Sequence, residues 1–409
     1  MTRLDRLTEK LQLNRFKLTS LLEMTKAIND NATVEELLSV YETIIREQLG
    51  ISKLMLFNEQ NNWDCLLSFG IQGEINLNPL ELFSQYDGIS VLESNSLLEQ
   101  AGFDVLIPVY HQSQPLAFLI IGDIDEDEIK ISPTIKHMNF IQTITNILAV
   151  AIENKRLAKE NIIKERMNKE LELAAEMQAM LVPEQFEVPH GMEVAAHYQP
   201  HQQVGGDYYD VIPLNNNEVI FCMADVSGKG VSAAFLMANF QANLHALVQY
   251  TDYSLSDMVE VLNNRVNQST RGERFITLFI ARVNFKQQSL RYINAGHNPP
   301  ILMRNSDLFL LEKGCIGLGM LEDIPRVEEG NIRLKKTNTL LLYTDGLTEL
   351  ENPNKEAFGL ERLGETMLQN RNVSMSELND SIVEAMEQFR KSAPYFDDTA
   401  LLSCRFSFS

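Results

Sequence analysis

Cysteines and long apolar runs are scarce in this sequence, and its first residues lack the pattern of a secretory leader. None of the four cysteines in the 409 residues belongs to a C-x-x-C pair. Zinc sites and disulfide frameworks depend on closely spaced ligands, so we expect buried, reduced thiols at Cys65, Cys222, Cys315 and Cys404. Apolar runs such as 115–121 are far shorter than the roughly 18 residues of a membrane-spanning helix. We therefore expect a cytoplasmic protein without membrane insertion.

Basic residues are too few to balance the acidic ones. The chain has 35 Lys and Arg against 56 Asp and Glu, which gives a formal net charge of −21. Phosphate backbones and anionic lipids repel such a polyanion, so we expect neither nucleic acid nor a membrane surface as a partner. Apolar residues make up 44% and charged residues 22%, which is the ordinary balance of a folded protein. The length predicts two or three domains.

The first domain is predicted over residues 15–155. Apolar residues recur at helical spacing from about residue 18 to 49, with a break at Asp30 and Asn31. The strand-like segments that follow are 53–58, 63–69, 105–110 and 116–122, and a further helix is predicted over 138–152. This order of elements predicts an α+β domain.

Residues 153–183 are predicted to form a helical linker that ends at Pro183. Apolar residues recur there every three or four positions, and six acidic and six basic residues surround them. These apolar residues are Ile163, Met167, Leu171, Ala174, Met177 and Leu181. A narrow apolar stripe in a charged surface suits a coiled-coil-like contact between two chains, so we expect a homodimer. The alternative is a single helix packed on its own domain.

The second domain is predicted over residues 190–409. Strands are predicted at 219–224, 275–284, 289–294, 301–304, 338–344 and 399–406, and helices at 232–249, 254–267 and 374–391. The whole chain is therefore expected to be an α+β multidomain protein.

Acidic residues stand at four distant corners of this second domain. Asp207 lies in a Gly-rich turn, Asp225 and Asp345 each follow an apolar strand, and Asp397 and Asp398 form a pair. If these corners meet, their repulsion is severe unless cations neutralise it. Oxygen ligands select Mg²⁺ or Mn²⁺, and two such ions would activate water for attack on a phosphoryl group. Taken singly, each Asp is also explained by an ordinary turn or a solvent-facing cap.

Six motifs of this domain resemble, in order and spacing, those of the metal-dependent protein phosphatases (PPM, type 2C-like), in the SpoIIE and RsbU branch that regulates sigma factors. They are VGGDYYD at 204–210, ADVSGKG at 224–230, NAGHNPP at 294–300, LLLYTDGLTE at 340–349, FGLERL at 358–363 and FDDTALL at 396–402. The resemblance covers about residues 190–409. It implies an α-β-β-α sandwich with two metals at one end of the strands.

The resemblance also implies which residues bind the two Mn²⁺ or Mg²⁺ ions and carry catalysis. The implied ligands are Asp207, Asp225, the backbone carbonyl of Val226, Asp345 and Asp397. Asp398 is the alternative to Asp397, because the family's D-D-x-T pattern is altered here and Thr399 follows the pair directly.

The motifs indicate the residues that contact the substrate less clearly than they indicate the metal ligands. Lys229, an arginine such as Arg274, or the metal alone would contact phosphate. Eukaryotic members of the family carry an acid-base His where this chain has Ser227, so no general acid is identified. His297 is a candidate for acid-base work or substrate contact. A structural hydrogen bond is its simpler interpretation, because it lies between a strand and a rigid turn.

The first domain resembles a GAF domain over residues 15–155, through its helical opening at 21–38 and the hairpin at 104–122. GAF domains bind small molecules or mediate dimerisation, so a small-molecule ligand is a candidate partner. The pattern does not indicate which ligand.

The two resemblances together predict a sensor-regulated protein phosphatase of bacterial signalling. Its substrate would be phosphoserine or phosphothreonine on a partner such as a STAS-domain anti-sigma factor antagonist. One alternative is a catalytically silent phosphatase fold used for binding. The other is a phosphatase of a small phosphorylated metabolite.

Overall fold

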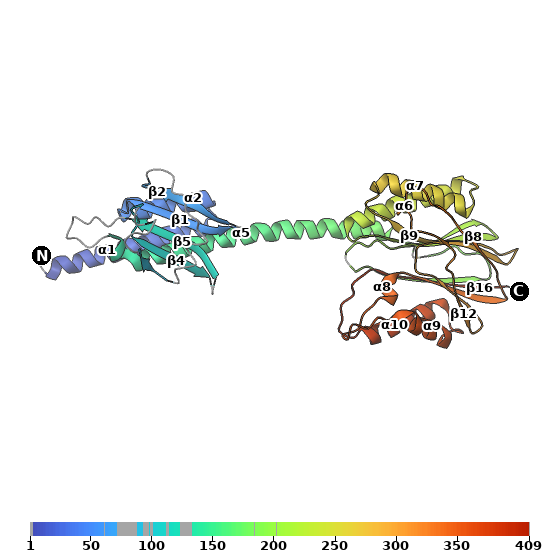
Figure 1. The fold of residues 1–409 in the computed structure, drawn as a ribbon. Helices are drawn as coiled ribbons and strands as arrows, with labels where there is room; N and C mark the ends of the chain where they lie inside the picture. Colours follow the sequence, from blue (N-terminus) through green and yellow to red (C-terminus); the bar gives the residue numbers. More distant parts are fainter. Residues whose placement is uncertain are drawn as a thin grey trace. The chain divides into compact units, whose positions relative to one another are not determined.

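The computed structural model describes residues 3–60, 62–71, 88–92, 98, 101–111, 114–122, 133–183, 185–201 and 203–408 (Figure 1). The chain divides into two compact units, Met1–Glu165 and Arg166–Ser409. Their boundary falls inside the long helix α5 (Pro133–Ala179), within the segment predicted as a linker.

The first unit is built on a five-stranded antiparallel sheet. Helices α1 (Arg3–Asn29) and α2 (Val34–Glu42) and the π-helical turn η1 (Thr43–Gln48) precede the strands. The strands are β1 (Lys53–Gln60), β2 (Asn62–Phe69), β3 (Ser90–Val91), β4 (Val105–His111) and β5 (Gln114–Gly122). Their order in the sheet is β2-β1-β5-β4-β3. The four strands predicted for this part of the chain are therefore present. The expected burial of all four thiols is wrong, because Cys65 of β2 is exposed and Cys315 is half-buried, whereas Cys222 and Cys404 are buried.

Side chains of β1 alternate between the two faces of this sheet, as the period of a strand requires. Leu54 and Leu56 belong to the core formed with the helices, whereas Met55 and Phe57 belong to a smaller cluster on the other face. A polar contact also joins two of the helices on that face, because the Tyr41 hydroxyl of α2 lies 2.6 Å from the Thr145 hydroxyl of α5.

The second unit contains two sheets that pack face to face. One has the order β13-β10-β9-β8-β7 with β14 beside β10, and the other has the order β12-β11-β15-β16-β6. The strands are β6 (Met192–Gln199), β7 (Tyr208–Asn215), β8 (Glu218–Val226), β9 (Ile276–Asn284), β10 (Ser289–Ala295), β11 (Ile301–Arg304), β12 (Asp307–Leu310), β13 (Gly314–Cys315), β14 (Gly330–Arg333), β15 (Thr337–Tyr343) and β16 (Thr399–Ser407). One core joins the sheets, and within it the rings of Phe221 and Phe406 meet edge to face at 5.6 Å.

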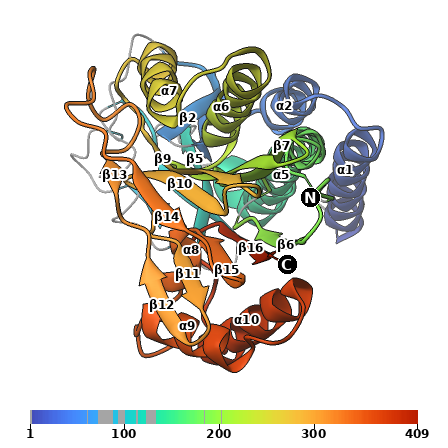
Figure 2. The ribbon, with the colours of Figure 1, turned by 90° about the vertical axis from the view of Figure 1, so that its right-hand side faces the viewer.

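Helices cover the outer faces of this pair of sheets (Figure 2). On one side, α6 (Val231–Tyr250) and α7 (Leu255–Thr270) pack on the sheet that contains β8 and β9. On the other side, α9 (Gly359–Gln369) and α10 (Met375–Arg390) share a core with β11, β15 and β16. The short helix α8 (Asp345–Thr348) follows β15. The second unit is therefore an α-β-β-α sandwich.

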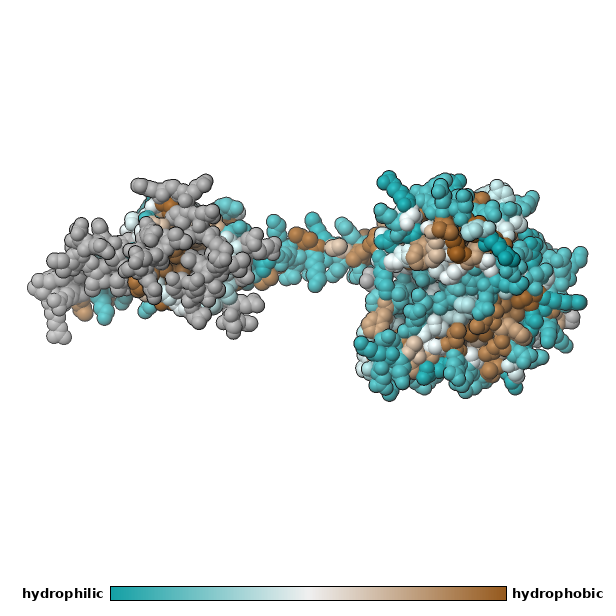
Figure 3. All heavy atoms as spheres, viewed as in Figure 1, coloured by the Kyte–Doolittle hydropathy of each residue, from teal (hydrophilic) through white to brown (hydrophobic). Residues whose placement is uncertain are grey.

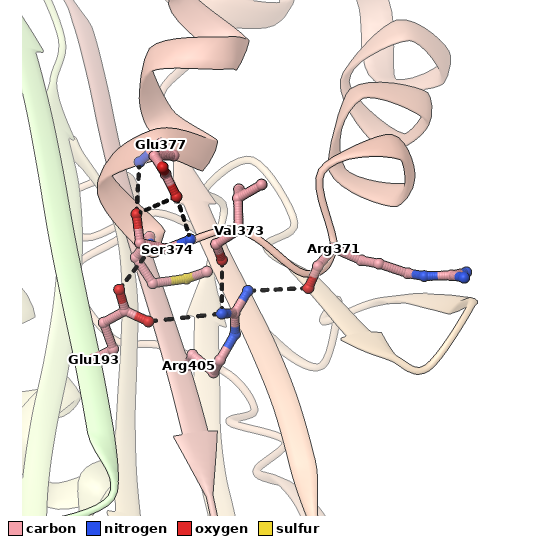
Figure 4. Close-up of polar contacts among 7 residues, drawn as sticks. Glu193, Arg371, Val373, Ser374, Glu377 and Arg405 are labelled. Atoms are coloured by element: carbon pink, nitrogen blue, oxygen red, sulfur yellow. Dashed lines mark hydrogen bonds and ion pairs between the residues drawn. The ribbon is translucent and has the colours of Figure 1, made fainter.

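Polar contacts fix the beginning of α10 against the sheet (Figure 4). Ser374 caps the helix, because its hydroxyl accepts from the Glu377 amide while the Glu377 carboxylate accepts from the Ser374 amide. From β16, the Arg405 guanidinium donates to the Val373 carbonyl at 2.7 Å and lies 3.6 Å from the Glu193 carboxylate of β6. These contacts join the helix to two neighbouring strands.

Several elements of the second unit were not predicted from the sequence, namely β6, β7, β12, β13, β14, α8 and α9. The strands β12, β13 and β14 have four residues or fewer, which is too short for a period to be read. All residues of β6 are half-buried, but the strand does alternate, because Met192, Val194, Ala196 and Tyr198 pack against the core between the sheets. This alternation was overlooked in the sequence.

Within the described residues, α6 is the one helix long and apolar enough to be a candidate membrane span. Length and composition alone do not separate such a span from a core helix. Leu236, Phe240 and Leu244 of α6 are buried in the core of the second unit.

Helix α5 runs without a break over its 47 residues. Several of its apolar side chains are exposed in a largely charged surface (Figure 3). The most exposed are Ile162, Ile163, Met167, Leu173 and Met177.

Candidate functional site

Two of the predicted carboxylates lie at one end of the sheet that contains β7 and β8. Asp207 directly precedes β7, and Asp225 is the residue before the last in β8. The two strands are antiparallel, with Tyr208 opposite Ala224. This register places Asp207 beside Asp225.

The other carboxylates lie at the end of β15 and the beginning of β16, which are antiparallel neighbours in the second sheet. Asp345 is the first residue of α8, and Asp397 and Asp398 directly precede β16. The two segments approach so closely that a Cβ atom on Gly346 would lie 1.9 Å from the Asp398 carbonyl oxygen. Glycine is therefore required at position 346, in the D-G pair of the motif.

The five carboxylates act on one another. Burial raises the pKa of Asp207 well above its ordinary value, and the charges of Asp225, Asp398 and Asp345 raise it further. Burial raises the pKa of Asp225 to about 7, with contributions from Asp345 and Asp397. Burial and Asp397 also raise the pKa of Asp345. The structure thus brings the four acidic corners together, and their charges repel one another there.

Asp397 and Asp398 have different partners. The two oxygens of Asp398 accept hydrogen bonds from the backbone amides of His201, at 2.8 Å, and Gly206, at 2.6 Å. Asp397 instead lies 2.8 Å from the Lys229 ammonium. Asp398 therefore fixes the loop that leads to Asp207, while Asp397 faces the ADVSGKG loop.

The oxygen atoms at this site suit a hard divalent cation. Oδ2 of Asp207 is buried and has no hydrogen-bond partner among the described residues. The backbone carbonyl of Val226 borders the same loop, 3.0 Å from where a Cβ atom on Gly206 would lie. Carboxylate and carbonyl oxygens are the ligands that Mg²⁺ and Mn²⁺ prefer. The carboxylates are not drawn around a single point, however, because no three His, Cys, Asp or Glu side chains in the described part of the chain form a group that could hold an ion.

Lys229 lies at the edge of a cavity of about 300 Å³ beside the carboxylates. The residues lining it are Lys229, Gly346, Glu349, Leu350, Glu351, Phe396 and Asp397. The Lys229 ammonium also donates to the Phe396 carbonyl, so this side chain connects the ADVSGKG loop to the segment before β16. A cation at the mouth of an acidic cavity can contact a phosphate group.

Arg274 supports the ADVSGKG loop. Its guanidinium donates to the Ser227 carbonyl at 2.8 Å and to the Ser232 hydroxyl at 2.9 Å. Through these two bonds, the guanidinium holds the loop against the beginning of α6.

His297 is buried away from solvent, with 5% of its surface exposed. Its Nδ1 lies 2.8 Å from the Thr277 hydroxyl, and its backbone amide donates to the Asn294 side chain. Burial lowers the pKa of His297 to about 4, so the imidazole is neutral at pH 7. Its Nε2 is buried and has no hydrogen-bond partner among the described residues. The contacts of Nδ1 and of the backbone amide are structural hydrogen bonds, and an acid-base or substrate role of His297 stays a prediction.

The motifs gave no indication of Gln178, which lies near the end of α5. Its side-chain amide donates to the Gly205 carbonyl at 2.5 Å, and its carbonyl oxygen accepts from the Gly205 amide at 3.1 Å. Gly205 is two residues before Asp207, so α5 is bonded directly to the loop that carries this carboxylate. One feature of the sequence could have identified Gln178: it is a polar residue four positions after Ala174, within the apolar stripe of the linker.

Comparison with known proteins agrees with this arrangement. Residues 215–407 match the family model described as Stage II sporulation protein E (SpoIIE). Phosphoserine phosphatase RsbU of Bacillus subtilis is 28% identical over 194 residues, which are 47% of this chain and 57% of that protein. These matches support a similarity of the second unit to the SpoIIE/RsbU family of PP2C-like phosphatases.

Two further relatives extend the comparison. Protein IcfG of Synechocystis is 26% identical over 269 residues, which are 59% of this chain and 42% of that protein. The SiaA-PP2C domain of Pseudomonas aeruginosa superposes with a TM-score of 0.52 at 16% identity, over 60% of this chain and 99% of that domain, and supports a PP2C-like fold. The chain spans about half the length of the curated relatives. PP2C-like phosphatases are generally metal-dependent.

Proposed function

We propose that this protein is a metal-dependent serine/threonine phosphatase of bacterial signalling. The observation that carries the proposal is the cluster of five mutually repelling carboxylates at the common end of two sheets, in a unit with a PP2C-like fold. A protein that used this fold only for binding would have no physical reason to keep so unfavourable a cluster.

The proposed ligands of two Mn²⁺ or Mg²⁺ ions are Asp207, Asp225, Asp345, Asp397 and the Val226 carbonyl. The unpartnered oxygen of Asp207 and the all-oxygen donor set support this assignment. The chemistry supplied by two divalent ions at such a site is activation of water and neutralisation of phosphoryl charge.

The surrounding residues have distinct proposed tasks. Asp398 holds the loop of Asp207 through two backbone amides, and Arg274 holds the ADVSGKG loop. Lys229 is the proposed phosphate contact, because it is half-exposed and lies beside both Asp397 and the cavity. The substrate is proposed to be phosphoserine or phosphothreonine on a partner protein, such as a STAS-domain anti-sigma factor antagonist.

We propose that the first unit is a GAF-like sensor that regulates this site through α5. The unbroken helix and its bonds from Gln178 to Gly205 support a mechanical connection. The exposed apolar side chains Ile163 and Met167 support a homodimer in which two α5 helices pair. The sensor ligand, if the GAF-like unit binds one, is proposed to be a small molecule, and the protein is proposed to act in the cytoplasm.

The test is phosphate release from a phosphoserine protein by the full chain with Mn²⁺ or Mg²⁺. Asp225→Asn and Asp345→Asn are expected to abolish release, whereas Asp252→Asn, at an exposed position of the same unit, is expected to leave it unchanged. Retained release in the first two variants would contradict the proposed site. Hydrolysis of free phosphomonoesters without hydrolysis of any phosphoprotein would favour the metabolite phosphatase, and absence of metal binding would favour the binding module.

A further inference from the structure

Tyr198 lies near the carboxylate site, and its role there is not explained by the motifs. Tyr198 is the residue before the last in β6, and it pairs with Ala400 of β16, two residues after Asp398. Its side chain therefore lies at the same end of the sheet as the acidic pair.

The Tyr198 hydroxyl lies against the loop that leads to Asp207. A Cβ atom on Gly205 would lie 2.1 Å from this hydroxyl oxygen and 2.6 Å from Oδ2 of Asp398. Only glycine at position 205 leaves room for both oxygens. The loop, the hydroxyl and the Asp398 carboxylate therefore share one small space.

This hydroxyl has no hydrogen-bond partner among the described residues, although its oxygen atom is fully buried. A buried hydroxyl without a partner is unfavourable by about 1–3 kcal/mol. Burial, followed by the charges of Asp398 and Asp207, raises the pKa of Tyr198, so the group keeps its proton and can only be a neutral donor or acceptor. Asp207 Oδ2 in the same site is buried without a partner as well.

The site therefore contains a buried donor and a buried acceptor that both lack a partner among the described residues, which indicates that a bound group completes it. We propose that Tyr198 belongs to the metal site, where its hydroxyl donates a hydrogen bond to an oxygen atom that surrounds the bound cation. Tyr198 is then a buried positioning residue, whereas Lys229 is half-exposed. This inference rests on the proposed metal dependence and adds a residue that the motifs do not include.

Tyr198→Phe in the full chain tests the proposal, because it removes the hydroxyl and leaves the ring in place. Without metal, the melting temperature of the variant is expected to equal or exceed that of the wild type, since an unpartnered polar group is lost. The dissociation constant for Mn²⁺, measured from the electron paramagnetic resonance signal of free Mn²⁺, is expected to rise roughly two- to tenfold, as for the loss of one hydrogen bond.

Tyr41→Phe is the matched control. It also removes a buried tyrosine hydroxyl, but that hydroxyl has a partner in Thr145. We expect this variant to melt at a lower temperature and to bind Mn²⁺ as the wild type does.

Two outcomes would overturn the proposal for Tyr198. If Tyr198→Phe lowered the melting temperature without metal and left Mn²⁺ binding unchanged, the hydroxyl would only support the Gly205 loop. Unchanged values of both quantities would also exclude a role at the metal site. If the wild type itself bound no Mn²⁺, the proposed metal-dependent function would fail first, and the two failures are thereby distinguished.

Discussion

Gln178 and Gly205 are joined by two hydrogen bonds that connect the last turns of α5 to the loop before Asp207. Both residues are buried, so water does not replace either bond. Gln178→Ala leaves the amide and the carbonyl of Gly205 unpaired, which is expected to lower the free energy of unfolding by about 2 kcal/mol or more. Phosphatase activity is expected to fall with it, because Asp207 loses its fixed position.

Activity and chemical denaturation of this variant are to be compared with those of Glu176→Ala, at an exposed position of the same helix. We expect the Glu176 variant to behave as the wild type. Full activity of Gln178→Ala would show that the bonds to Gly205 do not position the site.

The carboxylate cluster gives the metal-free protein a characteristic dependence on pH. The pKa of Asp225 is about 7 in the folded chain, against an ordinary value of 3.8. Between these two values the unfolded chain loses its proton first, so stability falls as pH rises from about 4 to 7. At about 1.4 kcal/mol per pKa unit the effect is on the order of a few kcal/mol.

Thermal melting in chelator between pH 4 and pH 8 measures this dependence. The difference between wild type and Asp225→Asn isolates the contribution of this carboxyl group, and the variant is expected to lose less stability over this range. Parallel curves for the two proteins would mean that neither burial nor the neighbouring carboxylates raise the pKa of Asp225.

His297 produces the opposite trend. Its pKa is lowered from 6.5 to about 4, so the unfolded chain binds a proton before the folded chain does as pH falls. The stability that the neutral, buried His297 contributes is therefore lost between pH 6.5 and 4. His297→Gln is expected to flatten this part of the melting curve. A curve as steep as that of the wild type would argue against a neutral buried imidazole.

Lys229 is expected to affect the substrate more than the fold. Its ion pair with Asp397 is half-exposed on both sides, and such pairs contribute about 1 kcal/mol or less. Lys229→Ala is therefore expected to leave the melting temperature nearly unchanged and to raise KM for the phosphoprotein several-fold. Lys336→Ala, at an exposed position outside the cavity, is the control. An unchanged KM would assign phosphate binding to the metal alone.

The apolar stripe of α5 predicts the oligomeric state. Ile163 and Met167 are each more than half exposed in the single chain. If two α5 helices pair through them, Ile163→Glu with Met167→Glu places like charges in the contact and is expected to yield monomers in light scattering. Asn161→Glu with Asn168→Glu adds the same two charges at exposed positions on the opposite side of the helix and is expected to leave the dimer intact. A wild-type monomer at micromolar concentration would refute the pairing.

The sequence was sufficient for features that are local in the chain. The carboxylate positions follow from the apolar strands that lead to Asp225 and Asp345. The break before α2 was predicted at Asp30 and Asn31, whereas its cap is Thr33, which forms a capping box with Glu36. Features that depend on contacts between distant segments could not be predicted. The different partners of Asp397 and Asp398 arise from amides nearly two hundred residues away and from Lys229.

The same limit explains why Tyr198 and Gln178 were missed. Neither residue belongs to a motif of the second unit, and each lies against Gly205, where a larger residue would collide with the Tyr198 hydroxyl. That constraint is visible only in three dimensions. His297 shows the reverse case, since its motif attracts a catalytic interpretation that its burial beside Thr277 does not support.

The repulsion among the five carboxylates also links the lifetime of the protein to metal supply. A cation that binds the folded chain and not the unfolded one adds stability by mass action, in proportion to the logarithm of its free concentration relative to its dissociation constant. Cells depleted of divalent metal would hold a larger unfolded fraction of this chain, which proteases remove. Under the proposed function, metal starvation would therefore lower the abundance of the enzyme as well as its turnover.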